Sequence, residues 1–152
     1  MSEANHIFCG HCGQINRVGI AWPVERARCG SCHELLFAGH PVEVDEAAFE
    51  RHAKRNDIPV LVDVWAPWCG PCRAMAPMFE KAAAALEPGV RLLKLNSDQA
   101  PQLSARLGIR SIPTMLLMKS GQILARASGA MNSDQIVRWT KSNLASDGAA
   151  NR

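Results

Sequence analysis

Apolar residues in the larger part of the chain occur in short continuous runs and in stripes at helical spacing. The run from Val60 to Trp65 is apolar except for Asp63, as expected of a strand that is covered on both faces. Other apolar runs predict four further strands, over residues 41–44, 90–95, 114–118 and 123–127. Strands that alternate with helices and end in a hairpin predict an α/β fold, with a central mixed β-sheet flanked by helices.

Four helices are predicted between and after these strands. Asp45 is a suitable N-cap for a helix that ends near Arg55. The longest helix is expected over 72–86, where Pro77 should kink it by removing one hydrogen bond. The spacing of its apolar residues predicts an inward face made of Met75, Phe79, Ala82 and Leu86. The remaining helices are predicted over 101–107, closed by Gly108, and over 133–144, with Ile136, Thr140 and Leu144 inward.

Composition and charge are those of an ordinary globular chain. Of the 152 residues, 47% are hydrophobic and 20% charged, and no stretch approaches the roughly 18 apolar residues of a membrane span. The first residues show no basic segment followed by an apolar one, so we expect no secretory signal and a cytoplasmic location. The net charge of +3 comes from scattered lysines and arginines, so neither a nucleic-acid nor a membrane partner is expected. We expect a monomer.

Four of the six cysteines form two CxxC pairs near the N-terminus. Sixteen residues separate the pair Cys9 and Cys12 from the pair Cys29 and Cys32, a spacing typical of a four-cysteine metal site. About forty residues bury too little apolar surface to fold alone, whereas one structural zinc ion can supply roughly 10–16 kcal/mol. We therefore predict one structural Zn²⁺ per chain, held by four thiolates, and unfolding of this segment when zinc is removed.

Three alternatives remain open for this cluster. The pairs can be two further redox centres, or the same ligands can hold iron. His11 or His33 can replace one cysteine as a ligand. In the zinc interpretation, three glycines let the backbone turn around the ligands: Gly10, Gly13 and Gly30. Metal analysis of the purified protein distinguishes these possibilities.

The cysteines divide the chain into a small N-terminal module, here named the head, and a larger body. The predicted divisions are 1–38 for the head, 39–42 for a linker, 43–146 for the body and 147–152 for a flexible tail. Within the head, residues 14–23 are expected to be an extended segment that pairs with the strand returning after it. Leu35, Leu36 and Phe37 are expected to fill the head's small core or to dock it on the body.

The other two cysteines, Cys69 and Cys72, follow the central apolar strand where the longest helix begins. Unpaired N–H groups and a partial positive charge at a helix start favour thiolate over thiol, which indicates Cys69 as the reactive residue. Two intervening residues let both sulfurs lie on one helical turn, close enough to form a disulfide. Pro71 fits the first turn, where its missing donor costs nothing. The stretch therefore predicts a dithiol/disulfide switch.

Asp63 is the one charged residue in the apolar run before these cysteines. Burial favours the neutral form of a carboxyl group and raises its pKa, so a buried Asp63 is costly to the fold. Either Asp63 occupies an exposed edge position, or it has a function.

Three segments resemble motifs of the thioredoxin family, in the family's order. They are residues 62–73, which contain Trp-Cys-Gly-Pro-Cys, then 94–96 and 108–114. The resemblance covers roughly residues 41–146 and implies the thioredoxin fold. With the four additional cysteines, the chain resembles the bacterial thioredoxin subtype that carries an N-terminal zinc ribbon.

The resemblance also implies roles for individual residues. Cys69 attacks a substrate disulfide, Cys72 resolves the mixed disulfide, Asp63 relays a proton for Cys72, and Lys94 lies near that aspartate. Pro113 is implied to be a cis proline that faces the disulfide. The implied substrate-binding residues are Trp68, Gly70, Pro71, Ile112 and Pro113, with Trp65 and Trp68 flanking the disulfide. Ser111 departs from the residues expected at its position, which leaves substrate preference open.

These roles imply a protein-disulfide reductase that acts in electron transport, cell redox homeostasis and the oxidative stress response. Its implied partners are disulfide-containing proteins and an NADPH-dependent thioredoxin reductase. We expect no bound organic cofactor, because the chain has no phosphate-binding glycine loop. The alternatives are a disulfide oxidase or isomerase, a binding module in which the head recruits a partner, and a zinc-linked redox sensor or chaperone.

Overall fold

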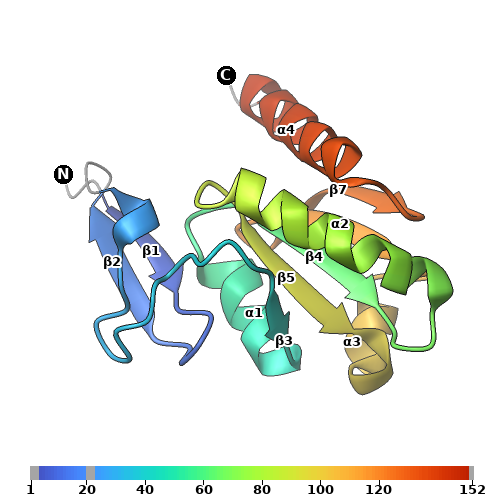
Figure 1. Cartoon of the computed structure of the whole chain (residues 1–152), viewed down its shortest axis with the longest axis horizontal. Coiled ribbons are helices and arrows are strands. Elements are labelled where there is room, and N and C mark those ends of the chain that lie inside the picture. The colour runs from blue at the N-terminus through green and yellow to red at the C-terminus, as the bar shows by residue number, and fades with distance from the viewer. Residues whose placement is uncertain (1–3, 20–22, 151–152) are drawn as a thin grey trace.

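The computed structural model describes residues 4–19 and 23–150, which form a small head beside a larger body (Figure 1). The body contains a five-stranded sheet with the strand order β3-β5-β4-β6-β7. β3, β5 and β4 run parallel, and β6 and β7 are each antiparallel to their neighbours, so the predicted mixed sheet is confirmed. The strands are β3 (Val42–Val44), β4 (Val60–Trp65), β5 (Arg91–Asn96), β6 (Thr114–Lys119) and β7 (Gln122–Ser128).

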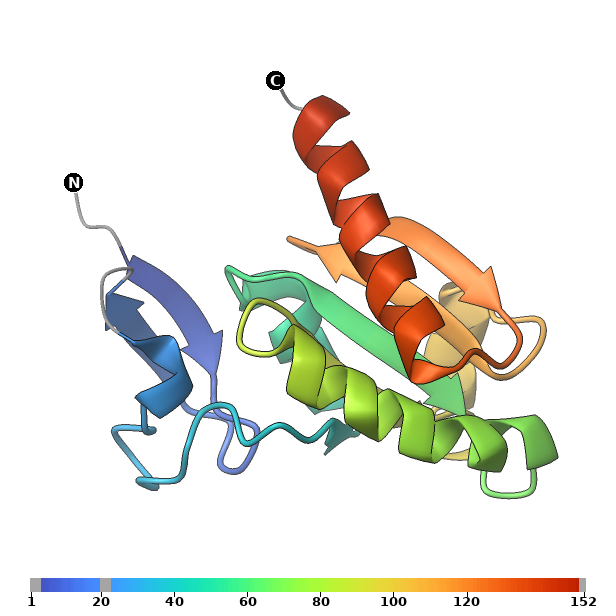
Figure 2. The same cartoon turned by 45° about the horizontal axis from the view of Figure 1, so that its top comes forward.

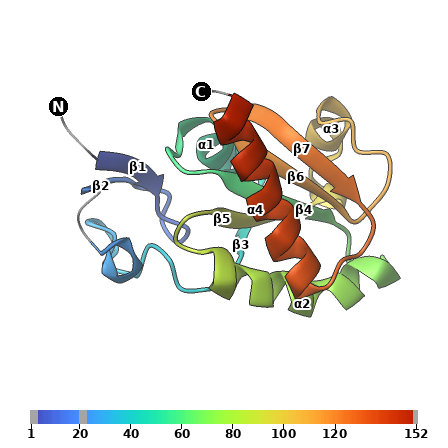
Figure 3. The ribbon, with the colours of Figure 1, turned by 90° about the horizontal axis from the view of Figure 1, so that it is seen from above.

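Helices cover both faces of this sheet (Figure 2, Figure 3). On one face, α1 (Glu46–Arg55) and α3 (Pro101–Arg106) bury Phe49 and Leu103 against alternate residues of the strands. On the other, α2 (Gly70–Leu86) and α4 (Ser133–Ala150) bury Phe79 and Ile136. Side chains alternate between the faces of a strand, and both faces are covered, so β4 and β6 are apolar at nearly every position.

The helix starts follow from their capping residues. Asp45 caps α1 as predicted, because its Oδ1 accepts a hydrogen bond from the Ala48 N–H at 2.8 Å. α2 begins at Gly70, two residues before the predicted start at Cys72, because Cys69 already acts as its N-cap. The predicted core stripe of α2 is buried throughout: Met75, Phe79, Ala82 and Leu86.

One helix is as expected at its proline, and another is longer than predicted. α2 contains Pro77 in its interior, as predicted. α4 continues past residue 144 to Ala150 and so includes much of the segment predicted as a tail, while residues 151 and 152 lie outside the described part. Within the described residues, no helix is both long and apolar enough to cross a membrane.

The head consists of a two-stranded sheet and a short helical turn. β1 (Ala4–Phe8) pairs antiparallel with β2 (Ile15–Gly19), and η1 (Val24–Arg26) follows. The 14–23 segment was predicted to pair with a strand that follows it, and in the described residues this prediction was wrong. The chain that follows forms only an isolated bridge between its own residues Arg28 and Leu35. The tight turn at Cys9 and Cys12 brings the chain back directly alongside β1, so β1 becomes the partner of β2. Residues 20–22 of that segment lie outside the described residues.

Arg91 joins the head to the body. It is only 1% exposed, and its Nη2 donates to the carbonyl oxygens of Phe8 at 2.9 Å and Leu36 at 2.8 Å. The guanidinium carbon lies 4.2 Å from the ring centre of Phe37, and Nη1 lies 3.7 Å from Glu87 Oε2. Burial lowers the pKa of Arg91 and raises that of Glu87. The two carbonyl contacts offset part of the cost of burying this ion pair.

Residues after α1 hold the outer edge of β1. Asn56 Oδ1 accepts from the Phe8 N–H at 2.7 Å, and its Nδ2 donates to Nδ1 of His52 at 2.8 Å. Asp57 accepts from the His6 N–H at 2.6 Å and returns its own N–H to the His6 carbonyl at 2.9 Å. Burial lowers the pKa of His52 to about 3, so this ring is neutral near pH 7 and accepts from Asn56.

Candidate redox site and metal centre

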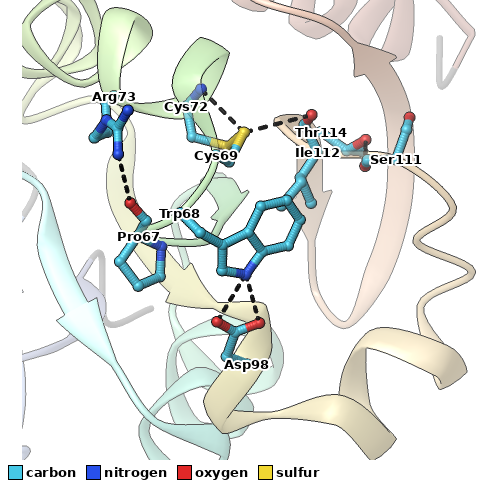
Figure 4. Close-up of a disulfide and its surroundings, with 9 residues drawn as sticks. All are labelled: Pro67, Trp68, Cys69, Cys72, Arg73, Asp98, Ser111, Ile112 and Thr114. Atoms are coloured by element: carbon cyan, nitrogen blue, oxygen red, sulfur yellow. Dashed lines mark hydrogen bonds between the residues drawn. A yellow bond between two sulfur atoms is a disulfide. The ribbon is translucent and has the colours of Figure 1, made fainter.

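The Cys69–Cys72 disulfide lies at the N-terminus of α2 (Figure 4). Cys69 is the N-cap residue, and its Sγ accepts a hydrogen bond from the Cys72 N–H at 3.2 Å. This N–H group and the helix N-terminus favour negative charge on the Cys69 sulfur once the disulfide is reduced. Cys69 is 5% exposed and borders a surface groove, whereas Cys72 is 2% exposed and does not. The first cysteine is therefore the accessible one.

The groove beside Cys69 has a volume of about 520 Å³. The Ile112–Pro113 peptide bond is cis, as predicted, and the Ile112 carbonyl oxygen lies 3.8 Å from Cys69 Sγ (Figure 4). Thr114 Oγ1 donates to the Ser111 carbonyl at 2.7 Å and so ties together the two ends of this turn. Four of the five predicted substrate-binding residues line the groove: Trp68, Gly70, Pro71 and Ile112.

Trp68 lies at the mouth of the groove and is 67% exposed. Its Nε1 donates to Asp98 Oδ2 at 3.0 Å and to Oδ1 at 3.2 Å (Figure 4). Asp98 belongs to η2 (Ser97–Gln99), and no sequence pattern indicated this contact because it joins segments that the fold brings together. Trp65 is partly buried and packs against the disulfide cysteines. The indole of Trp68 is thus fixed in an exposed position on the groove that Cys69 also lines.

Asp63 is completely buried in β4, which excludes the alternative of an exposed edge position. Neither of its carboxyl oxygens has a hydrogen-bond partner among the described residues. Burial raises the pKa of Asp63 to about 7; Lys94 opposes this shift and Glu43 adds to it. Because side chains alternate along a strand, Asp63 shares its face of β4 with Trp65, which packs against the disulfide. A carboxyl group that exchanges a proton near neutral pH therefore lies on the disulfide side of the sheet.

Asp63 belongs to a row of three charged residues across adjacent strands. In the sheet register, Asp63 of β4 is opposite Lys94 of β5, which is opposite Glu43 of β3. Lys94 Nζ lies 3.7 Å from Glu43 Oε1 and 4.6 Å from the centre of the Trp65 ring. The structure thus brings Lys94 beside Asp63. Glu43 was not singled out from the sequence, because its place in the row depends on the order of strands in the sheet.

The four cysteines of the head converge at one point. Their Sγ atoms all lie within 4.8 Å of one another. The shortest separations join the two knuckles, which are the turns that hold each CxxC pair: 3.6 Å for Cys9 and Cys32, and 3.5 Å for Cys12 and Cys29. The group consists of these four thiols without His11 or His33. Four cysteines are therefore positioned to bind a metal ion.

The two knuckles share one pattern of backbone hydrogen bonds. The Cys9 N–H donates to the Gln14 carbonyl at 2.9 Å, and the Cys29 N–H donates to the Glu34 carbonyl at 2.8 Å. Cys9 Sγ also accepts from the His11 N–H at 3.3 Å, and Cys29 Sγ accepts in the same way from Ser31 at 3.4 Å. Hydrogen bonds from N–H groups favour the thiolate form that metal ions bind. The Cys32 N–H lowers the pKa of Cys29 to about 6, whereas burial and the neighbouring thiols raise the pKa of Cys32.

The glycines of the knuckles have different roles from those predicted. Gly13 has a φ of 78°, in the left-handed region, and His33 adopts 67° at the matching position of the second knuckle. Gly10 is needed for a close contact, because a Cβ there would lie 2.7 Å from Val42 Cγ2. A Cβ on Gly30 would meet only Asn16 Oδ1, at 3.8 Å. Only Gly13, of the three predicted glycines, provides an unusual backbone angle.

The chain is similar to known proteins in family, in sequence and in structure. The family model for thioredoxin matches residues 40–142. The chain is 39% identical to thioredoxin C-3 of Corynebacterium nephridii over an alignment of 138 residues. This alignment covers 91% of this chain and 94% of that protein. It is 39% identical over 101 residues to a thioredoxin of Rickettsia bellii, covering 66% of this chain and 96% of that protein. The solved structure of chloroplastic thioredoxin z aligns with a TM-score of 0.64 and 26% identity, over 70% of this chain and 96% of that one. These matches confirm the fold class predicted from the sequence.

Proposed function

Because this chain belongs to the thioredoxin family, we propose that it is a disulfide oxidoreductase that works as a reductase of disulfides in other proteins. The observation that carries this proposal is the position of the Cys69–Cys72 pair. Cys69 lies at a helix N-terminus beside an open groove, and Cys72 lies behind it in the interior. One sulfur is available to a substrate and the other to complete the reaction.

The reaction is two successive thiol–disulfide exchanges. The Cys69 thiolate attacks one sulfur of the substrate disulfide, so the substrate S–S bond breaks, a mixed disulfide forms and one substrate thiolate leaves. The Cys72 thiolate then attacks Cys69 Sγ, which forms the Cys69–Cys72 disulfide and releases the second substrate thiolate. Two electrons pass to the substrate, and the two cysteines are oxidised together.

Asp63 accepts the proton that Cys72 must lose before its attack. A carboxyl group with a pKa of about 7 is partly ionised near neutral pH, so it can both take up and release a proton there. Lys94 limits the shift by its positive charge. If this assignment holds, Asp63→Asn slows the resolution step more than the initial attack, and the two rates are separated by stopped-flow kinetics with a disulfide peptide. Equal effects on both steps would make Asp63 a structural residue.

The substrate is an extended segment on either side of its disulfide cysteine. Trp68, Gly70 and Pro71 provide one wall of the groove, and residues 109–112, directly before the cis Pro113, provide the other. The exposed indole offers an apolar surface, and the main chain at Ile112 pairs with the substrate backbone.

A trapping experiment tests the order of attack. Cys72→Ser leaves Cys69 able to attack but removes the resolving thiol, so mixed disulfides with a disulfide-containing protein such as insulin should accumulate on non-reducing gels. Cys69→Ser is the matched control and should trap nothing. Accumulation on the Cys69→Ser variant, or on neither variant, would contradict the proposed roles.

We also propose that the metal of the head is zinc, held by Cys9, Cys12, Cys29 and Cys32. Four thiolates within one tetrahedral-sized cluster suit Zn²⁺, which would serve as a structural cross-link between the knuckles. Metal analysis by mass spectrometry should find about one zinc per chain, and Cys12→Ser should lose it. Iron in place of zinc, or much less than one metal ion per chain, would overturn this assignment.

The remaining parts of the proposal concern the cellular setting. A cytoplasmic monomer that is recycled by an NADPH-dependent thioredoxin reductase would contribute to electron transport, redox homeostasis and the oxidative stress response. The main alternative is an oxidase or isomerase, and the redox potential separates the two. A value near −270 mV, the known value for thioredoxin, supports a reductant, whereas about −180 mV, typical of protein disulfide isomerase, supports the alternative.

A further inference from the structure

The head carries a second groove of about 520 Å³, formed by one edge of β2 and the chain around η1. Its lining includes Asn16 to Gly19 on one side and Arg26 to Arg28 on the other. The head and the loop that carries the Cys69–Cys72 pair lie toward opposite ends of the molecule (Figure 1). This groove is therefore separate from the redox site, and none of the four head cysteines lines it.

Three exposed arginines surround this groove: Arg17, Arg26 and Arg28. Within residues 4–19 and 23–150, none of them forms an ion pair with a carboxylate. Arg28 Nη1 donates to the His33 carbonyl at 3.0 Å, which holds that side chain against the second knuckle. The groove thus has a positive charge that the described residues do not neutralise, and an anionic ligand would be attracted to it.

Besides its charge, the groove has unpaired backbone groups of β2 that can form hydrogen bonds with a ligand. β1 turns its outer edge to the body, where both the N–H and the carbonyl of His6 bond to Asp57. His6 is opposite Arg17 in the antiparallel register. Because the backbone groups of His6 bond to Asp57 and not to Arg17, the two residues form a non-hydrogen-bonded pair, in which the backbone groups of each residue point away from the other strand. The N–H and carbonyl of Arg17 consequently point to the open edge of β2, beside the groove. In the described residues, that edge pairs with no other strand.

We propose that this groove binds an extended acidic segment of a partner protein, which adds as a strand to the free edge of β2. Alternate backbone groups of the segment pair with Arg17, and its carboxylates lie beside the three guanidinium groups. A phosphate backbone matches the charges but has no N–H to donate to the Arg17 carbonyl. A second copy of β2 would bring like charges together along the edge. An acidic peptide satisfies both the charges and the strand edge.

Fluorescence anisotropy with a labelled peptide tests this inference on the full-length, metal-loaded protein. The probe is an eight-residue peptide that alternates glutamate and threonine, and its comparison peptide has glutamine in place of each glutamate. The glutamate peptide should bind, with an affinity that falls as salt rises. Arg17→Gln with Arg26→Gln should weaken binding about tenfold, as expected for the loss of two exposed charge pairs. Arg28 is left intact because of its bond to the second knuckle.

Three controls make the outcome specific. Arg138→Gln, which removes an exposed arginine on α4, should leave peptide affinity unchanged. Circular dichroism and insulin reduction should be unchanged in the double variant, since neither arginine lies near the redox site. N-methylation of alternate amides in the peptide should abolish binding, because it blocks strand pairing. The proposal is overturned if the glutamate and glutamine peptides bind equally, if the double variant binds as well as the parent, or if an eight-nucleotide oligodeoxythymidine binds more tightly than the peptide.

Discussion

Replacing Asp63 by asparagine should stabilise the oxidised protein, and should do so more strongly as the pH rises. Asp63 is fully buried, its oxygens have no hydrogen-bond partner among the described residues, and burial raises its pKa from the ordinary 3.8 to about 7. That difference corresponds to about 4 kcal/mol by which the ionised carboxylate destabilises the folded state above pH 7. Asparagine has a similar shape and no charge, so the substitution removes this cost.

The sign follows from proton binding. The folded pKa of Asp63 is above its unfolded value, so the folded state binds more protons between about pH 4 and 7. The contribution of Asp63 to stability is therefore greatest in acid and falls as pH rises through this window. His52 acts in the opposite direction, because burial lowers its pKa from 6.5 to about 3 and its contribution rises with pH over that range. The pH dependences of stability that Asp63 and His52 cause have opposite signs. The difference in unfolding free energy between variant and parent is therefore needed to isolate the contribution of Asp63.

Urea unfolding of the disulfide form, followed by tryptophan fluorescence, measures this difference. The Asp63→Asn variant should exceed the parent by about 1–2 kcal/mol at pH 5 and by about 4 kcal/mol at pH 8.5. Any cost of burying the amide is independent of pH and shifts both values equally, so the decisive quantity is the increase of about 2–3 kcal/mol between them. Asp134→Asn, at an exposed position on α4, should show no such increase. A gain that is the same at both pH values would refute the argument from burial.

Two further substitutions test the neighbours of this site and the head–body contact. Glu43→Gln removes a negative charge that raises the pKa of Asp63, and it frees Lys94 from its ion pair. The pKa of Asp63 should therefore fall, and the pH dependence of the resolution step should move to lower pH. A shift to higher pH in stopped-flow profiles would contradict this reasoning. Arg91→Met leaves two carbonyl groups without a donor and Glu87 without its ion pair, and should destabilise the protein by about 3–5 kcal/mol in urea unfolding. Combining it with Glu87→Gln should recover part of the loss, whereas an additive loss would show that the ion pair is not the cause.

The body was largely predictable from the sequence because its local signals agree with its tertiary structure. Continuous apolar runs became the central strands β4, β5 and β6, and the stripe from Met75 to Leu86 became the buried face of α2. The end of α4 was not predictable, because residues after 144 lack an apolar stripe and yet continue the helix to Ala150. The partner of β2 was also mistaken, since pairing in the head is decided by the tight turn at the first knuckle and not by apolar periodicity.

The residues of the candidate sites also divide into those that local motifs predict and those that only the fold brings together. The cysteines and the cis Pro113 were recognised from motifs, in which the chemistry and the spacing lie within a few residues. The residues that were missed act across long sequence separations. Asp98 holds Trp68, and Glu43 joins the charged row only because β3 is next to β5. Burial of Asp63 was resolved by the structure alone, since an apolar run interrupted by one carboxylate fits both an edge and an interior position.

Arg91 shows how the head, which carries the four-cysteine cluster, and the body can influence each other. One of its two carbonyl partners belongs to Phe8, the residue directly before Cys9, so fixing Cys9 to a metal also fixes an acceptor of Arg91. Without an ordered head, Arg91 would lose its two carbonyl acceptors. Glu87 accepts from the N–H of Gly39, the first residue of the predicted linker, at 2.9 Å, so the chain directly after the head is tied to the same ion pair. If the cluster binds a metal ion as proposed, linkage makes this effect reciprocal: a substitution that weakens the Arg91 contacts must weaken metal affinity by the same free energy that metal removal takes from the contacts. Since β5 carries both Arg91 and Lys94, the strand that anchors the head is also the one that faces Asp63.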